Sequence, residues 1–160
     1  MTTSKLIAAS ILVLGLSFGA GMPASWAETA SHDGHQAAAT MALTLNAGEK
    51  WQGDDNMVKG MNGIRAAIAP LIPAIHGQAL PASGYQSLAG DVQTQVDFMI
   101  TNCKLAPEVD EQFHMVLEQV LTGVSEMKAE QTQEAGAVRI VTALNSYGDY
   151  FTHPGWQPLE

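Results

Sequence analysis

The chain has 160 residues, of which 46% are hydrophobic and 14% are charged. This balance excludes a protein that is disordered throughout and favours a single domain with a hydrophobic core. The formal net charge of −9 at pH 7 makes nucleic acid and anionic membrane surfaces poor partners.

Residues 1–27 have the pattern of a secretory signal peptide. Lys5 supplies a positive charge, an apolar run follows as far as Phe18, and Ala27 completes the small-residue pattern that signal peptidase reads. We expect export, cleavage near Ala27 and a periplasmic location. The mature chain should be soluble, without stable membrane insertion, and it keeps six Lys and Arg against sixteen Asp and Glu.

Residues 28–53 are expected to form a flexible arm that leads into the folded domain. They are rich in Ala and Thr and show no sustained period, apart from a short docking piece near Leu43 and Leu45. His32 and His35 suit a divalent metal, but at this spacing in a flexible segment they would bind weakly without further ligands. A solvated tail is the alternative.

The domain expected at residues 54–160 opens with a helix. Asp54 is a suitable N-cap, and apolar residues at spacings of four and three then mark the buried seam of a bundle helix. The seam consists of Met57, Met61, Ile64, Ile68, Leu71 and Ile75. Because Pro70 and Pro73 fall inside this seam, the helix should kink or loosen in its final turns.

Three further helices are expected. The second runs from a capping box of Ser83 and Gln86 to about Lys104. The third begins at Pro107, because proline and the acidic residues behind it suit a helix start. The fourth carries an apolar stripe over residues 137–151. Four helices with short connections predict an all-α, up-down-up-down antiparallel four-helix bundle.

In this topology the starts of the first and third helices lie at the same end of the bundle as the ends of the second and fourth helices. Soft and imidazole side chains converge there, and thioether, thiolate and imidazole groups suit a soft metal such as Cu(I). The candidate metal ligands are Met57, Met61, Met99, Cys103 and His114. Ordinary core packing is the alternative for the four sulfur residues, and a half-exposed histidine bonded to water or a carboxylate is the alternative for His114.

Two short motifs and the four-helix layout resemble the periplasmic b-type cytochromes and the wider cytochrome c-prime-like bundles. The motifs are Asp-Asp-Asn-Met, ending at Met57, and Asn-Ser-Tyr-Gly-Asp-Tyr at residues 145–150. In that family a methionine near the start of the first helix and a histidine near the end of the last hold haem. Met57 matches the methionine, whereas Gly148 stands in the histidine's place and no Cys-x-x-Cys-His is present. The resemblance therefore implies the fold and the compartment, and it suggests a haem-free relative.

Three functions remain open. The first is a small periplasmic binding or carrier protein for a metal ion, copper, or another small ligand at one bundle end. The second is a b-type haem electron carrier that uses Met57 and His153 as axial ligands. The third is a metal-free structural or interaction protein, in which Cys103 is buried and Trp51 and Trp156 contact a protein partner. Catalytic patterns such as Gly-x-Ser-x-Gly are absent from the sequence, so we expect no enzymatic activity.

Overall fold

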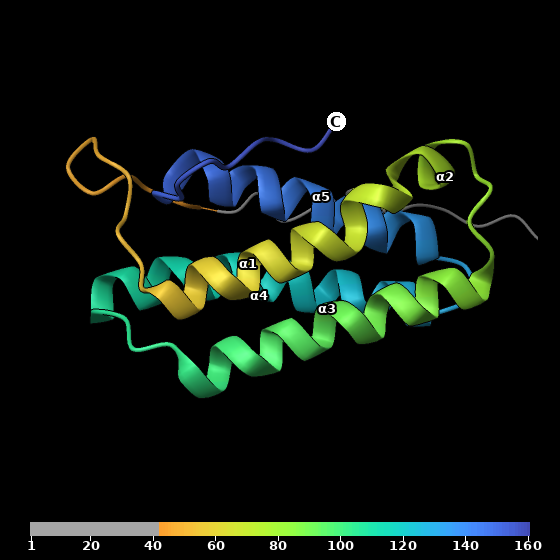
Figure 1. Ribbon diagram of the computed structural model, residues 1–160, viewed down its shortest axis with the longest axis horizontal. Helices are drawn as coiled ribbons and strands as arrows, with labels where there is room; N and C mark the ends of the chain where they lie inside the picture. Colours follow the sequence, from red (N-terminus) through yellow and green to blue (C-terminus); the bar gives the residue numbers. More distant parts are fainter. Residues whose placement is uncertain (1–41) are drawn as a thin grey trace, which may run out of the picture. The chain divides into compact units, whose positions relative to one another are not determined.

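The computed structural model describes residues 42–160, and the predicted signal peptide and the pair His32 and His35 lie outside the described residues. Residues 42–160 form helices and two isolated β-bridges but no β-strand. The helices are α1 (Asp55–Ile68), the 3-10 turn η1 (Ala69–Leu71), α2 (Ile72–His76), α3 (Ala82–Asn102), α4 (Pro107–Lys128) and α5 (Gln133–Tyr150). The four long helices lie side by side (Figure 1), which confirms an all-α bundle for this part of the chain.

The first helix begins where the sequence predicts, and it loses its regular α-helical form near the two prolines, as predicted. The Asp54 carboxylate accepts the backbone N–H of Met57 at 2.8 Å and so caps α1. The regular helix stops at Ile68, and the chain continues through η1, which contains Pro70, into the short α2, which contains Pro73. A proline removes a backbone hydrogen-bond donor and crowds the preceding turn. The apolar seam of the first helix therefore continues beyond Ile68 only in short helical turns.

The start of α3 differs from the prediction. The helix begins at Ala82, directly after Pro81, and no side chain caps it. The Pro81 carbonyl accepts the N–H of Gly84 at 2.8 Å, so the first turn closes on the backbone alone. Because the helix starts before Ser83, that residue already lies within the first turn. The predicted capping box of Ser83 and Gln86 is therefore wrong.

Helices α4 and α5 approach each other closely. The α4 helix begins at Pro107, as predicted, with Glu108 and Asp110 in its first turn, where acids favour the helix dipole. Further along, a Cβ on Gly123 would come within 2.7 Å of the Gly136 carbonyl, and a Cβ on Gly136 would overlap the backbone of α4. Glycine at both positions thus lets the two backbones touch.

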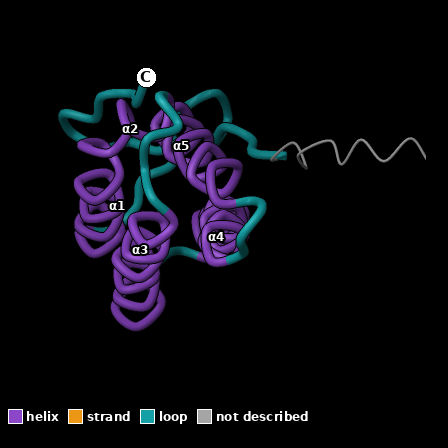
Figure 2. The backbone as a smooth tube through the Cα atoms, turned by 90° about the vertical axis from the view of Figure 1, so that its right-hand side faces the viewer, coloured by secondary structure: helices purple, strands orange, loops and turns teal. Residues whose placement is uncertain are grey.

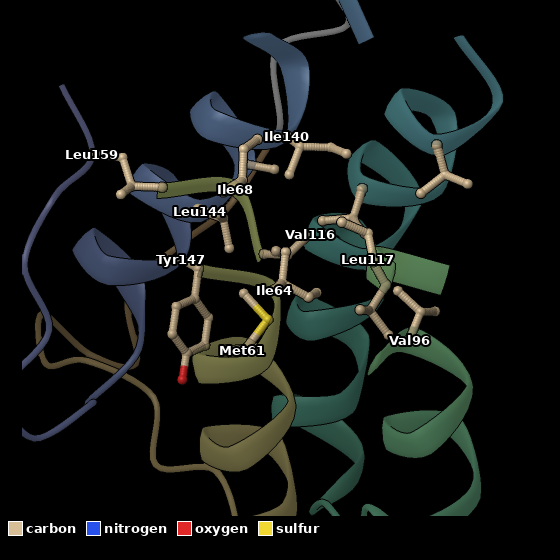
Figure 3. Close-up of a cluster of buried hydrophobic side chains, with 14 of the residues drawn as sticks. Met61, Ile64, Ile68, Val96, Val116, Leu117, Ile140, Leu144, Tyr147 and Leu159 are labelled. Atoms are coloured by element: carbon tan, nitrogen blue, oxygen red, sulfur yellow. The ribbon is translucent and has the colours of Figure 1, made fainter. Parts of the chain in front are cut away.

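The core extends through all four long helices. Figure 3 shows Met61 and Tyr147 among the aliphatic side chains of the neighbouring helices. The largest fully buried side chains include Tyr147, Phe113, Phe151, Met57, Met61, Met99 and Met127. In the segment before α1, Leu43 is only 7% exposed, which agrees with the predicted docking piece, whereas Leu45 is 43% exposed and does not join the core.

Hydrogen bonds bring the start of α1 to the ends of α3 and α5. The Asn56 side-chain amide donates to the Asn102 carbonyl at 2.9 Å. The backbone N–H of Trp51 donates to the Tyr150 carbonyl at 2.8 Å, and that of Thr152 donates to the Trp51 carbonyl at 2.9 Å. We call this end of the bundle the Asp54 pole.

The four long helices lie in two neighbouring pairs. Figure 2 shows α1 beside α3 and α4 beside α5. None of the helices within residues 42–160 combines the length and the hydrophobicity that crossing a bilayer requires.

Candidate functional site

Asp54 connects three groups at the Asp54 pole. One carboxylate oxygen caps the Met57 N–H at 2.8 Å, and the other accepts the backbone N–H of Lys104 at 2.7 Å. The Cys103 thiol lies near this carboxylate and helps to lower its pKa. Burial alone would raise the pKa of Asp54, but the hydrogen bonds from Lys104 and Met57 outweigh it and lower the pKa. The carboxylate is therefore ionised at neutral pH.

Cys103 forms the C-terminal cap of α3 and is half-buried. Burial raises the pKa of the Cys103 thiol to about 12, and the nearby charges of Asp54 and Asp110 act in the same direction. The thiol therefore carries its proton at neutral pH. A thiol in this state reacts slowly, and a metal ion that binds it must displace the proton.

His114 is held in one orientation on the surface of α4. Its Nδ1 lies 2.8 Å from the Asp110 carbonyl oxygen and 3.4 Å from the Asp110 carboxylate. Both neighbours are acceptors, so in the neutral form of the ring Nδ1 carries the proton and Nε2 keeps its lone pair. Histidines that bind metals in proteins are commonly oriented by such a bond from the other ring nitrogen.

Three of the five predicted metal ligands share one cavity. Met99, Cys103 and His114 line a space of about 250 Å³ between α3 and α4, which we call the sulfur cavity. Its other lining residues are Ile100, Leu105, Asp110, Phe113 and Leu117. Residues of α3, its C-terminal cap and α4 therefore border one space, although Met99 is only 1% exposed and a Cβ on Gly60 of α1 would overlap its thioether.

The other two predicted ligands lie in the core. Met57 and Met61 have no exposed surface, and neither lines the sulfur cavity. A Cβ on Gly53 would overlap the Met57 thioether, so this side chain packs directly on the backbone that precedes α1. These positions agree with core packing for Met57 and Met61.

The side chains that could act as ligands differ in the metal ions that they prefer. Within residues 42–160, no three His, Cys, Asp or Glu side chains gather closely enough to hold a metal ion. Zinc and the hard ions Ca²⁺ and Mg²⁺ are bound by such groups. Methionine sulfur, by contrast, is a ligand for Cu(I).

The residues at the positions that the cytochrome resemblance indicates do not fit haem. A Cβ on Gly148 would overlap the Trp156 indole, so Trp156 covers the place of the family's histidine. His153 lies beyond α5 and its Nδ1 pairs with the Tyr147 hydroxyl at 2.9 Å. Met57 is completely buried. Met57 therefore offers no open coordination position, and the Nδ1 of His153 is already paired.

Comparison of the chain with protein-family models, curated proteins and solved structures finds no match. The cytochrome resemblance therefore depends on the helical layout and the two short motifs alone.

The structure also shows features that the sequence reasoning missed. Asp54 was predicted as a cap, but a carboxylate has a second oxygen, and that oxygen holds Lys104 and the Cys103 region in place.

A hollow of about 430 Å³, which we call the α3–α4 groove, is lined by Ile100, His114, Leu117, Glu118, Leu121, Thr122 and Ser125. Ile100 is 65% exposed and Leu121 is 37% exposed. Exposed apolar side chains that gather in this way are typical of a binding surface.

Proposed function

We propose that this chain is an exported small carrier protein that binds Cu(I) in the sulfur cavity. The observation that carries the proposal is that Met99, Cys103 and His114 line the same space. Export follows from the signal pattern of residues 1–27, with cleavage near Ala27 and a periplasmic location. Copper in such a compartment must be held and transferred by soft donors, and this role requires no catalysis.

The proposal includes the antiparallel, up-down-up-down course of the four long helices. The hydrogen bonds from Asn56 to Asn102 and from Trp51 to Tyr150 support it, because they join the start of α1 to the ends of α3 and α5. In this course the chain is a haem-free relative of the b-type cytochrome bundles. The position of Trp156 supports the loss of haem, because its indole occupies the space that a Cβ at position 148 would need.

Each residue of the sulfur cavity has a defined part in binding. The Nε2 lone pair of His114 is available because Asp110 holds the Nδ1 proton. Met99 supplies a neutral thioether when its side chain turns from Gly60 of α1 toward the cavity. Cys103 loses its proton to solvent as the Cu–S bond forms.

The test is a titration of the purified mature protein with Cu(I) against a chromophoric chelator of known affinity. We expect one equivalent to bind, with the affinity falling by about tenfold or more in Met99→Leu, Cys103→Ser and His114→Gln. Met61→Leu is the matched control, since Met61 is buried away from the cavity, and its affinity should not change. Absence of uptake, or an equal loss in the control, would refute the proposal.

A metal-free interaction protein is the second candidate, and the α3–α4 groove favours it. Ile100 is largely exposed at the edge of this groove. A photo-crosslinking residue at position 100 should capture a defined protein partner in the native compartment, whereas one at the exposed Ala66 of α1 should not. Equal labelling from the two positions would argue against a partner for the groove.

A further inference from the structure

A second cavity lies at the Asp54 pole, where the segment before α1, the end of α5 and the segment after α5 meet. We call it the Trp156 cavity. It has a volume of about 220 Å³ and is lined by Lys50, Asn145, Gly148, Asp149, Phe151, His153, Trp156 and Pro158. None of these residues lines the sulfur cavity, so the two sites are separate.

The indole N–H of Trp156 has no acceptor. Its Nε1 is the one buried side-chain nitrogen or oxygen within residues 42–160 that makes no hydrogen bond. By contrast, Trp51 at the same pole donates its indole N–H to the Thr44 carbonyl at 2.6 Å. A buried donor without a partner is unfavourable and requires an explanation, and a bound acceptor supplies one.

Lys50 brings a positive charge to the wall of this cavity. Lys50 lines it and donates to the Gly148 carbonyl at 2.6 Å, which leaves two further N–H groups on its ammonium. The Arg65 guanidinium lies 5.9 Å from the Trp156 ring. Arg65 is not part of the lining, and its Nε donates to the Gln157 carbonyl at 3.0 Å, so the ammonium of Lys50 is the cation at the cavity wall. Asp149 is the single carboxylate in the lining.

His153 adds a third donor to the lining. Burial raises the pKa of Tyr147, so its hydroxyl keeps its proton, and within the described chain that hydroxyl bonds only the His153 Nδ1, at 2.9 Å. The hydroxyl therefore donates to Nδ1. Burial, and then the charge of Arg65, lower the pKa of His153, so the ring is neutral and carries its proton on Nε2.

We propose that the Trp156 cavity binds a small monocarboxylate, whose oxygens accept hydrogen bonds from Trp156 Nε1 and Lys50 Nζ. The unpartnered indole N–H and the ammonium supply two donors to one acidic group. Asp149 opposes a second negative charge, so a monoanion fits better than phosphate or a dicarboxylate. The site does not depend on the binding of copper elsewhere in the bundle.

The test follows the indole N–H signals by two-dimensional ¹H–¹⁵N NMR while sodium acetate is added to the purified protein. The Trp156 signal is assigned with Trp156→Phe, and sodium chloride at the same ionic strength is the reference. We expect a saturable shift of the Trp156 signal with acetate and none with chloride. The Trp51 signal should stay in place, because its N–H already has an acceptor.

Two lysine variants distinguish a defined binding site from nonspecific attraction of anions to positive charge. Lys50→Met should weaken acetate binding by about tenfold or more, since a charged donor is lost, while Lys128→Met, at the end of α4, should leave it unchanged. If Lys50→Met does not fold, Trp156→Phe is measured by calorimetry instead and should lose acetate binding. A shift that does not saturate, that chloride reproduces, or that phosphate produces more strongly would overturn the proposal.

Discussion

The Asp54 carboxylate accepts the backbone N–H of Lys104 at 2.7 Å, across fifty positions of sequence. Because the other oxygen of the same carboxylate caps α1, this one side chain fixes the start of α1 against the end of α3. The thiol of Cys103 immediately precedes Lys104 and is held in the same arrangement. The position of one predicted copper ligand therefore depends on a residue of another helix.

Asp54→Asn should lower the free energy of unfolding by about 1 kcal/mol, because the amide keeps the shape but loses one charged acceptor. Urea denaturation of the metal-free protein measures this change. Asp55→Asn is the matched control, since Asp55 is exposed in the first turn of α1 and should change stability by only a few tenths of a kcal/mol. Equal losses in the two variants would contradict the role of the Lys104 bond.

The same carboxylate should contribute to acid sensitivity. The pKa of Asp54 is lowered in the folded protein from an ordinary value of 3.8. Its stabilising contribution is therefore fully present above pH 3.8 and is lost as the pH falls through the lowered folded value. Thermal unfolding of wild type and Asp54→Asn at a series of pH values should show the two curves converging below pH 3.8. Parallel curves down to strong acid would be inconsistent with this linkage.

Cys103 should react slowly with iodoacetamide in the native protein. Its pKa of about 12 leaves very little thiolate at neutral or mildly alkaline pH. Asp54→Asn removes a nearby negative charge, so it should lower the pKa and speed the alkylation. Mass spectrometry of timed samples measures the rate, and Asp97→Asn, on an exposed part of α3, is the control. No acceleration in Asp54→Asn would show that burial alone sets the reactivity.

Cu(I) binding should become tighter as the pH rises. The thiol is protonated throughout the neutral range, so each metal ion that binds Cys103 displaces one proton. The apparent affinity should rise about tenfold per pH unit above neutrality, since one proton is released. Chelator competition at several pH values measures this slope. In Cys103→Ser the slope should be absent, and a flat wild-type curve would mean that the thiol is not a ligand.

Two glycine variants should have opposite effects. Gly136→Ala places a methyl group against the backbone of α4 and should cost about 2 kcal/mol or more, because backbone cannot move aside cheaply. Gly90 lies in α3 with open space beside it, so Gly90→Ala should stabilise the protein by about 0.5–1 kcal/mol. Denaturation midpoints compare the two. A stabilising Gly136→Ala would contradict the close approach of α4 and α5.

Residues that act on the local backbone were the most predictable from sequence. Asp54 caps α1, Pro107 opens α4, and the prolines near Ile68 end the regular part of α1. These effects depend on only a few neighbouring residues. The Ser83 cap failed because Pro81 starts α3 two positions earlier and closes its first turn through the backbone.

The candidate sites were less predictable, because they depend on contacts between distant segments. The seam pattern alone cannot show that Met99 lines the sulfur cavity whereas Met57 does not, because both side chains are almost completely buried. Both occupy equivalent seam positions. The Trp156 cavity needs the segments on either side of the helical domain, and these have no periodic pattern that would show how they pack.

The side-chain amide of Asn145 donates to the carbonyl of Leu159 at 2.9 Å and accepts its N–H at 2.8 Å. Aspartate lacks the donor and leucine lacks both groups, so only an amide of this length satisfies the pair. Because this pair holds the closing segment against α5, we expect the segment to join after that helix has formed. The same docking sets the Trp156 indole against Gly148, where a larger residue would not fit.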